Sequence, residues 1–381
     1  MVYLDNASSS FPVHKSICDE MDRINRLLPA AAGYDYHYAR LTMQLIEDAR
    51  QKAAQFMHIN NVNRVIFTAS ATDAANRILG GMDWHSGDVV FVSPYEHNCV
   101  LRPLNRLKDM YGIRICELPL HDNLELNLDR LKALFSENKP RLVCCTYVSS
   151  VTGYILPIKD IINEAKNAGS RVLVDASLSV GLIDIETDDV DFLVFSGHKS
   201  IGGPVGAGCM ILGRGVLPDA YISGDTMSDS SDLCMPKALP ARYEPGCLNV
   251  SAVAGLGRAI DYIFQEGIKK LYTKNKALTD LLVKELSSIE RVRVYIPENR
   301  EKHLSIVSFN IEGLTCDECA YLLDRHYDIA VKSGLHGAAL THKYLSDEDF
   351  NGTVRAGIGL FTTQKDIEEL VCAVRNIAAS L

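Results

Sequence analysis

The chain has 381 residues, enough for one large domain or two domains of roughly 100–200 residues each. Hydrophobic residues make up 47% and charged residues 23%, a globular balance that excludes an intrinsically disordered chain. Carboxylates outnumber Lys and Arg by 48 to 39, and this net charge of −9 argues against nucleic acid or an anionic membrane as the main partner. The opening residues show no leader pattern and no run of about 18 apolar residues occurs, so we expect a cytoplasmic protein without membrane spans.

Eleven cysteines are spread along the chain, and their surroundings indicate their roles. Cys144, Cys145 and Cys209 lie inside apolar runs, which is typical of small buried side chains in a reducing compartment and not of a disulfide framework. Cys316 and Cys319 form a spaced pair, but no second pair accompanies them. We therefore expect these two residues to begin a helix, and we predict no metal site.

Short apolar segments rich in Val and Ile alternate with longer segments of helical periodicity. The predicted strands are 64–70, 88–93, 114–120, 141–148, 171–177, 191–196 and 207–212. The clearest helical patterns are 42–57, 73–82 and 158–169. Near-continuous apolar strands separated by helices predict an α/β fold, in which helices cover both faces of a parallel sheet.

The sequence changes character after Pro245. A long helical stretch, two strands and a closing helix follow, at 251–288, 291–297, 303–310 and 366–381. This pattern indicates a smaller α+β domain. We predict a large domain over 15–254 and a small domain formed by 1–14 together with 255–381, with the ligand site in the cleft between them.

Two charged residues follow strands at the predicted carboxyl edge of the sheet. Lys199 lies in SGHK, directly after a strand, and burial would lower its pKa and suit it to covalent chemistry with a carbonyl group. A solvated loop lysine is the alternative. Asp175 ends the strand RVLVD, where a carboxylate points into the ligand crevice and can pair with a protonated pyridine nitrogen. A helix N-cap is the alternative here.

Three further segments carry candidate binding residues. Ala71 and Thr72 lie in the turn TASATD, whose amides at a helix start can hold a phosphate or simply cap the helix. His97, in EHN, can stack on an aromatic cofactor and act as an acid or base, or it can be structural. Arg355, in GTVR, can bind a carboxylate through two parallel hydrogen bonds, or it can be a surface arginine.

In this order, the segments resemble the fold-type I pyridoxal-phosphate enzymes of the class V aminotransferase group, and within it the cysteine desulfurases and selenocysteine lyases. The likeness runs over nearly the whole chain, through YLDNASSSFP, IFTASATDAAN, EHNCVLRPL, VDASLSVG, FSGHKSIGGPVGAG, YEPGCLNV and GTVRAGIG. It implies a mostly parallel seven-stranded sheet in the large domain, bound pyridoxal 5'-phosphate, a small amino-acid substrate and a homodimer with its active sites at the interface.

The resemblance also implies roles for the matching residues. Lys199, His97 and Arg355 would be the catalytic residues, with Lys199 holding the cofactor covalently. The residues implied to bind the cofactor are Ala71, Thr72, His97, Ser150, Asp175, Ser177, Ser196, His198, Lys199 and Thr226. Asn6 and Arg355 are implied to bind the substrate. Thr226 in SGDTM and the segment YEPGCLNV are implied to reach the active site of the partner subunit.

The largest departure from the family lies in SGLHGAA (333–339). Desulfurases carry a catalytic cysteine in this mobile loop, and Gly337 stands in its place. Because glycine has no thiolate to attack the substrate sulfur, a persulfide cannot form at this position. No cysteine lies between Cys319 and Cys372, and Cys247, where the family usually has threonine, is the best candidate for a replacement.

Two more departures lie beside the implied cofactor. A family asparagine is replaced by Ser150 and a family glutamine by Leu178. Both family amides hydrogen-bond the phenolic oxygen of the cofactor. Losing these donors is expected to raise the pKa of the lysine–cofactor linkage, because its deprotonated, anionic form is less stabilised.

These observations favour a cysteine desulfurase-like enzyme that cleaves the Cβ–S or Cβ–Se bond of cysteine, selenocysteine or a related amino acid. Cleavage would proceed by β-elimination to pyruvate and ammonia, or by selenium release without a loop persulfide. An aminotransferase or epimerase on the same fold is the alternative enzyme. A catalytically reduced, cofactor-binding partner in sulfur trafficking is the alternative outside catalysis, and a sulfur-acceptor protein is a candidate partner of the enzyme.

Overall fold

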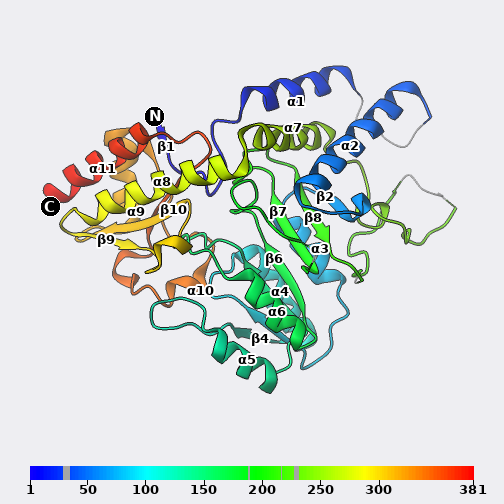
Figure 1. The fold of residues 1–381 in the computed structure, drawn as a ribbon, viewed down its shortest axis with the longest axis horizontal. Helices are drawn as coiled ribbons and strands as arrows, with labels where there is room; N and C mark the ends of the chain where they lie inside the picture. Colours follow the sequence, from blue (N-terminus) through cyan, green and yellow to red (C-terminus); the bar gives the residue numbers. More distant parts are fainter. Residues whose placement is uncertain (29–34, 188, 216, 227–230) are drawn as a thin grey trace.

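The structure is a computed structural model that describes residues 1–28, 35–187, 189–215, 217–226 and 231–381. Figure 1 shows a large α/β part around a central sheet and a smaller part that contains both chain termini. The main helices are α1 (Lys15–Leu27), α2 (His37–Phe56), α3 (Ala71–Gly81), α4 (Asn98–Tyr111), α5 (Leu128–Glu137), α6 (Ile158–Asn167), α7 (Val250–Glu266), α8 (Ile268–Ser287), α9 (Cys316–Tyr327), α10 (Ala339–His342) and α11 (Gln364–Ala379).

A seven-stranded sheet forms the centre of the large part, in the order β2-β8-β7-β6-β5-β3-β4. Its strands are β2 (Val65–Thr68), β3 (Val89–Val92), β4 (Arg114–Glu117), β5 (Leu142–Thr146), β6 (Arg171–Asp175), β7 (Phe192–Ser196) and β8 (Gly208–Leu212). Neighbouring strands from β7 to β4 pair in parallel, whereas β8 pairs antiparallel with both β7 and β2. The mostly parallel seven-stranded sheet that the sequence predicts is therefore confirmed.

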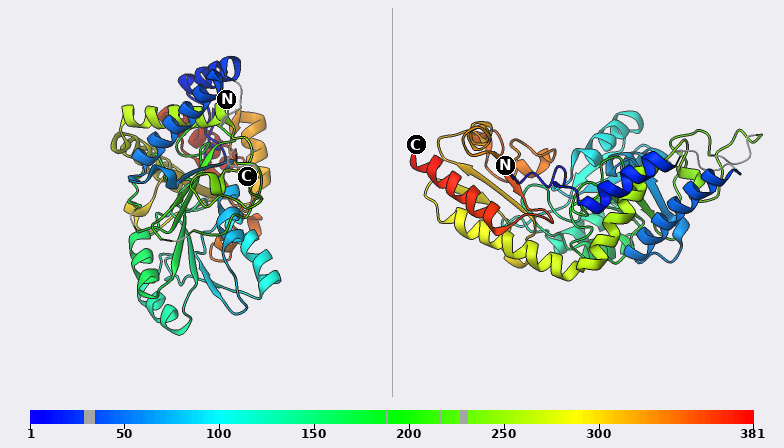
Figure 2. Two further views of the ribbon diagram at one scale, coloured as in Figure 1. Left: turned by 90° about the vertical axis from the view of Figure 1, so that its right-hand side faces the viewer. Right: turned by 90° about the horizontal axis from the view of Figure 1, so that it is seen from above.

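Helices cover both faces of this sheet, as the apolar strands require (Figure 2). Successive strand residues alternate between two hydrophobic cores, because side chains in a strand point to opposite faces. Val65 and Phe67 of β2 pack in one core with residues of α1, α2, α5, α6 and α7. Ile66 packs in the other core with residues of α3 and α4. Apart from the edge strand β4, the strands are buried on both sides, which leaves their carboxyl ends as the edge where a ligand can bind.

The smaller part has its own core around a three-stranded antiparallel sheet in the order β12-β10-β9. Its strands are β9 (Val292–Tyr295), β10 (Ile306–Ile311) and β12 (Val354–Gly357). The N-terminal strand β1 (Val2–Tyr3) joins this part by pairing in parallel with β11 (Ile329–Ala330). The predicted single helical stretch 251–288 is wrong in one respect, because Gly267 at φ +84° separates α7 from α8. The limits of the two predicted domains stay a prediction.

All eleven cysteines are free thiols, and Cys144, Cys145 and Cys209 are buried in strands. Cys316 is the first residue of α9, which confirms the predicted helix start. Within the described part of the chain, no three His, Cys, Asp or Glu side chains gather to hold a metal ion. Among the same residues, no helix is long and apolar enough to cross a bilayer.

Candidate active site

The carboxyl ends of the parallel neighbours β6 and β7 form the floor of the site. Asp175 ends β6 and is 5% exposed, and Ser196 ends β7. Ser177 connects them: its amide donates to Asp175 Oδ1 at 2.9 Å, and its hydroxyl accepts from the amide of Ser196 at 3.2 Å. Three of the predicted cofactor residues thus lie in one hydrogen-bonded chain at the sheet edge.

Lys199 lies in the turn after β7 and is half-buried. Gly197 lets this turn pack tightly, because a Cβ there would lie 2.7 Å from the main-chain oxygen of Ala207. Lys199 lines a narrow cavity of about 20 Å³ together with Asn6 and Leu178. The amine-bearing side chain therefore lies between the sheet edge and the N-terminal segment, and Leu178 lines the same cavity. The effect of Leu178 on the cofactor stays a prediction.

The N-terminus of α3 meets the same edge. Ser70 caps this helix, and the amide of Ala71 donates to Ser196 Oγ at 2.9 Å. The sequence left open whether this amide holds a phosphate or only caps the helix, and in the structure it is engaged. His198 Nδ1 is buried without a hydrogen-bond partner. A helix N-terminus, a hydroxyl and an unpaired imidazole nitrogen are groups that suit a phosphate ligand.

His97 is the N-cap of α4, and its Nδ1 accepts a hydrogen bond from the amide of Cys99 at 3.1 Å. In the neutral ring the proton is therefore on Nε2. Burial, followed by the positive charge of Lys199, lowers the pKa of His97 to about 4, so the imidazole is neutral at pH 7. His97 and Thr72 line an open cavity of about 370 Å³ between α3 and α4. A neutral ring there can stack on an aromatic cofactor.

Gly337 packs directly against His97. The main-chain oxygen of Gly337 accepts from the amide of Asn98 at 2.7 Å, which fixes residue 337 at the start of α4. A Cβ on Gly337 would lie 2.5 Å from His97 Nε2, closer than real side chains approach. The position where the family has its catalytic cysteine is therefore adjacent to the imidazole, and a side chain there would require the imidazole or the main chain to shift.

The smaller part contributes Arg355 to the site. This residue lies in β12 and is 2% exposed. Its two Nη atoms donate to the main-chain oxygen of Ser150 at 3.0 Å and to Asp5 Oδ1 and Ser8 Oγ, each at 3.1 Å. Burial lowers the pKa of the guanidinium, and the charge of Asp5 opposes this effect. Arg355 Nε and Ser150 Oγ are both buried without hydrogen-bond partners, so the guanidinium and the turn after β5 retain polar atoms for a ligand.

Two residues of the site were missed by the sequence analysis. Lys332 is a second cation beside Arg355: its Nζ donates to Ser8 Oγ at 3.2 Å, and burial, then the charge of Arg355, lower its pKa. The thiol of Cys99 donates to Asp175 Oδ2 at 3.6 Å. Cys99 lies in the segment EHNCVLRPL, but the resemblance implies no role for it, and both contacts join segments far apart in the chain.

The remaining predicted site residues are Asn6, which also lines the cavity of Lys199, and Thr226. Asn6 Nδ2 donates to the main-chain oxygen of Gly357 at 3.0 Å, which holds the N-terminal turn against β12. Its contact with a substrate stays a prediction. Thr226 follows Asp225, whose main-chain oxygen accepts from the amide of Gly246 at 2.7 Å. The two segments implied to reach the partner subunit thus lie side by side, and their role there stays a prediction.

The sequence model of class-V aminotransferases matches residues 2–370 of this chain. The chain belongs to the class-V aminotransferase family. A probable cysteine desulfurase of Methanothermobacter thermautotrophicus is 31% identical, over 99% of this chain and 94% of that protein. A cysteine desulfurase of Yersinia pestis is 29% identical, over 99% of this chain and 93% of that protein. The apo structure of a cysteine desulfurase from Thermococcus onnurineus superimposes with a TM-score of 0.89 at 27% identity, covering 100% and 95% of the two chains.

These likenesses confirm the predicted fold-type I architecture and a cysteine desulfurase-like enzyme of the class-V aminotransferase family. Enzymes of this family generally use pyridoxal phosphate. The residues at the sheet edge fit such a group, since a buried carboxylate, a lysine and a helix N-terminus converge there. The unpaired buried atoms His198 Nδ1 and Ser150 Oγ are further sites for a polar ligand.

Proposed function

We propose that this chain is a lyase that cleaves the Cβ–S or Cβ–Se bond of cysteine, selenocysteine or a related amino acid, without a persulfide on segment 333–339. The contact of Gly337 with His97 carries this proposal, because the expected position of the catalytic thiol holds no side chain. The retained Lys199, Asp175 and Arg355 support a working enzyme and weigh against an inert binding protein.

We infer that pyridoxal 5'-phosphate is held at the carboxyl edge of the sheet. Asp175 would pair with the ring nitrogen, and Lys199 would bind the cofactor covalently. The start of α3, with Ser196 and His198, would hold the phosphate, as a helix N-terminus suits an anion. When bound, this cofactor supplies an electron sink that stabilises negative charge at the substrate Cα.

Lys199 and His97 divide the handling of protons at the site. Lys199 is a half-buried amine in the turn after the floor strand β7, and we assign it the transfer of the substrate Cα proton. The pKa of about 4 keeps His97 neutral, so it adds no positive charge that would repel the substrate amine. The neutral ring carries its proton on Nε2, because Nδ1 accepts from the amide of Cys99.

Arg355 and Lys332 are assigned to the substrate carboxylate. Both cations are buried or half-buried, and both donate to Ser8 Oγ, at 3.1 and 3.2 Å. A second anion between them would compensate two desolvated positive charges, beside the carboxylate of Asp5. Arg355 Nε, which has no partner, provides a further donor.

Because residue 337 has no thiol to accept the sulfur, the sulfur is released as hydrogen sulfide. The Cβ–S bond breaks with its electron pair on sulfur, which takes up a proton and leaves as hydrogen sulfide. The remaining three-carbon fragment takes up water and gives pyruvate and ammonia. Cysteine and water thus become pyruvate, ammonia and hydrogen sulfide, with no external oxidant or reductant.

We propose further that the enzyme is a homodimer in a reducing cytoplasm. Leu217, Tyr221, Ile222 and Leu233 are 40–98% exposed in the single chain, and they flank the segment that carries Thr226. An interface there would cover this apolar surface. Eleven free thiols support the reducing compartment. A sulfur-acceptor protein has a role only if sulfur is transferred and not released as sulfide. Light scattering on the purified protein tests the dimer.

The test of the function is product analysis with the purified holoenzyme, using cysteine, selenocysteine, cystine and alanine as substrates. We expect pyruvate and ammonia in equal amounts, together with sulfide from cysteine, selenide from selenocysteine and thiocysteine from cystine, and no product from alanine. Lys199→Ala is the matched inactive control. Alanine formed together with transferred sulfur would contradict elimination and would direct attention to Cys247.

Two other outcomes would replace the proposal with an alternative. Stoichiometric conversion of the cofactor to its amine form, with a keto acid as product, would identify an aminotransferase. If none of the amino acids changed the absorbance of the bound cofactor, the cofactor-binding partner without catalysis would be favoured.

A further inference from the structure

Residues 333–342, here called the docked segment, form a wall beside His97. The main-chain oxygen of Gly337 accepts from the amide of Asn98 at 2.7 Å, and Thr341 Oγ1 donates to the main-chain oxygen of Pro94 at 2.9 Å. The two groups of the large part that make these hydrogen bonds, the amide of Asn98 and the main-chain oxygen of Pro94, lie on either side of His97 in the sequence. The docked segment is therefore attached on either side of the residue that it covers.

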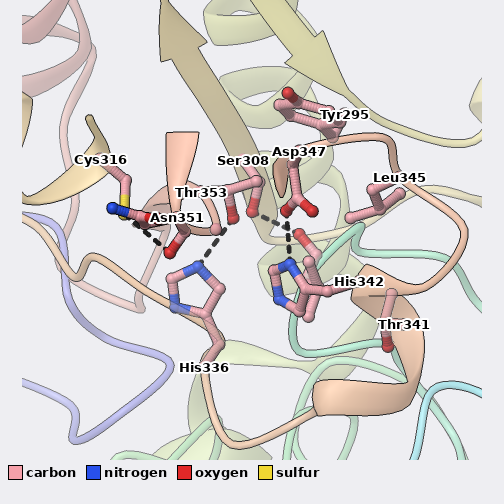
Figure 3. A network of polar contacts seen from close by, with 12 residues as sticks. Tyr295, Ser308, Cys316, His336, Thr341, His342, Leu345, Asp347, Asn351 and Thr353 are labelled. Atoms are coloured by element: carbon pink, nitrogen blue, oxygen red, sulfur yellow. Dashed lines mark hydrogen bonds and ion pairs between the residues drawn. The ribbon is translucent and has the colours of Figure 1, made fainter. Parts of the chain in front are cut away.

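The other side of the docked segment is anchored in the smaller part (Figure 3). His336 Nε2 lies 2.8 Å from Thr353 Oγ1, and His342 Nδ1 hydrogen-bonds Asp347 Oδ2. His336, His342 and Asp347 are 3%, 6% and 2% exposed. Gly334 and Thr353 also exchange two main-chain hydrogen bonds, at 3.1 and 3.2 Å. These buried contacts fix the main chain of the docked segment and leave it little freedom to withdraw.

Gly337 lies between the contacts with the large part and those with the smaller part, and its main chain is packed against the imidazole of His97. Its φ of +70° is in the left-handed region that favours glycine. A Cβ would lie 2.5 Å from His97 Nε2 and 2.8 Å from His97 Cδ2. The ring cannot turn away without losing its own bond, because Nδ1 accepts from the amide of Cys99 at 3.1 Å. Only a residue without a side chain satisfies both contacts.

We propose that Gly337 is a positioning residue for His97: its bare Cα closes on the Nε2 edge of the imidazole and holds the ring in place. It follows that a cysteine at residue 337 would displace His97 before it could act as a thiol. This inference rests on the proposed function, in which His97 lies against the cofactor. It adds that the site is built around the glycine, so the missing thiol cannot be restored by a single substitution.

Gly337→Ala and Gly337→Cys test this proposal, with Gly334→Ala as the matched control. Gly334 lies in the same docked segment at φ +96°, and a Cβ there would have no atom within 4 Å. The control therefore introduces the same kind of backbone strain without a contact to His97. Three measurements are made on each holoenzyme. They are the visible circular dichroism of the cofactor, kcat and KM for cysteine, and the mass of the peptide that contains residue 337 after turnover.

We expect both substitutions at Gly337 to change the circular dichroism band and to lower kcat by about tenfold or more, with KM less affected. Gly334→Ala should stay within about twofold of the wild type. Gly337→Cys should carry no persulfide. Wild-type dichroism and kcat in Gly337→Ala, or a persulfide on the cysteine variant with an unchanged spectrum, would overturn the proposal.

A His97→Ala background separates a direct effect on the imidazole from general damage. If Gly337 acts through His97, Gly337→Ala should add no further change in kcat or folding once the ring is absent. The same background should restore folding if the single variants at Gly337 do not fold, and failure to restore it would contradict the proposal. If the wild type released no pyruvate, the proposed reaction would be wrong, while the dichroism series would still report on the position of His97.

Discussion

The thiol of Cys99 lies 3.6 Å from Asp175 Oδ2 and donates a hydrogen bond to it, inside the candidate site. Burial raises the pKa of this thiol well above its ordinary value, and the charge of Asp175 adds to the effect. Cys99 is therefore a hydrogen-bond donor to the carboxylate and not a nucleophile. Although it is a cysteine within the site, it cannot take over the role of the missing thiol at residue 337.

Cys99 should consequently resist alkylation in the native protein. Brief treatment with iodoacetamide at pH 8, followed by peptide mass spectrometry, should label the exposed Cys18 and Cys372 and leave Cys99 unmodified. Unfolded protein should be labelled at all three positions, which controls for peptide recovery. Labelling of native Cys99 at a rate near that of Cys18 would show that its thiolate is accessible and would reopen its catalytic role.

Asp175→Asn should lower kcat while the protein stays folded. Asparagine keeps an oxygen for the amide of Ser177 but removes the negative charge assigned to the ring nitrogen. A hydrogen bond to a charged group contributes about 1.5–3 kcal/mol, so we expect a loss of about 10- to 150-fold. Asp191→Asn is the control, because Asp191 accepts from the amide of Val172 at 2.9 Å and is not among the residues of the site. Unchanged kcat in Asp175→Asn would contradict the assignment.

Arg355→Lys should raise KM for the amino-acid substrate more than it changes kcat. A lysine cannot reproduce the forked contacts of Arg355 with Ser150 and Asp5, and it loses the unpaired Nε. We expect a rise in KM of about 10- to 150-fold, which corresponds to the loss of one hydrogen bond to a charged group, about 1.5–3 kcal/mol. Arg293→Lys in β9, where the guanidinium donates to the main-chain oxygens of Ser346 and Leu345, should leave KM unchanged. A fall in kcat alone would place Arg355 outside carboxylate binding.

Local sequence patterns were sufficient for much of the fold. The runs RVIFT, DFLVFS and RLVCCTYV are apolar at nearly every position, and they became β2, β7 and β5, which are buried on both faces. Lys199 and Asp175 were found because they follow such strands directly, and the carboxyl ends of parallel strands gather at one edge. Where residues are neighbours along the chain or at the end of adjacent strands, sequence alone placed them.

Tertiary contacts explain what the sequence did not predict. The antiparallel direction of β8 depends on its pairing with both β2 and β7, which no local pattern encodes. The sequence left open whether the amides at the start of α3 hold a phosphate or only cap the helix. In the structure the amide of Ala71 donates to Ser196 Oγ at 2.9 Å, which comes from a strand 125 residues later. Lys332 Nζ donates a hydrogen bond to Ser8 Oγ, although the two residues are 324 positions apart in the sequence. Such pairs are set by how the two parts pack, so single-residue chemistry could not identify them.

Glu96→Gln should stabilise the protein increasingly as the pH rises. Glu96 is fully buried, its Oε1 accepts from the hydroxyl of Ser93 and the amide of Thr146, and its Oε2 has no partner. Burial raises its pKa from 4.5 to about 8, so the folded protein keeps this acid protonated at pH 7 whereas the unfolded chain ionises it. The stability that the protonated acid provides is complete below pH 4.5 and is lost as the pH rises to about 8.

Glutamine imitates the protonated acid at every pH, so the two proteins should be equally stable near pH 4 and should diverge above it. At about 1.4 kcal/mol per pH unit, the difference in unfolding free energy should reach on the order of 3 kcal/mol at pH 7, measured by urea denaturation. Glu244→Gln is the contrasting control. Glu244 is buried and paired with Arg50 at 2.7 and 2.9 Å, so its substitution removes the buried counter-charge of Arg50 and leaves the half-exposed Glu47 at 3.2 Å as its ion pair. This loss should destabilise the protein throughout this range. A pH-independent difference for Glu96→Gln would show that Glu96 is ionised in the folded protein.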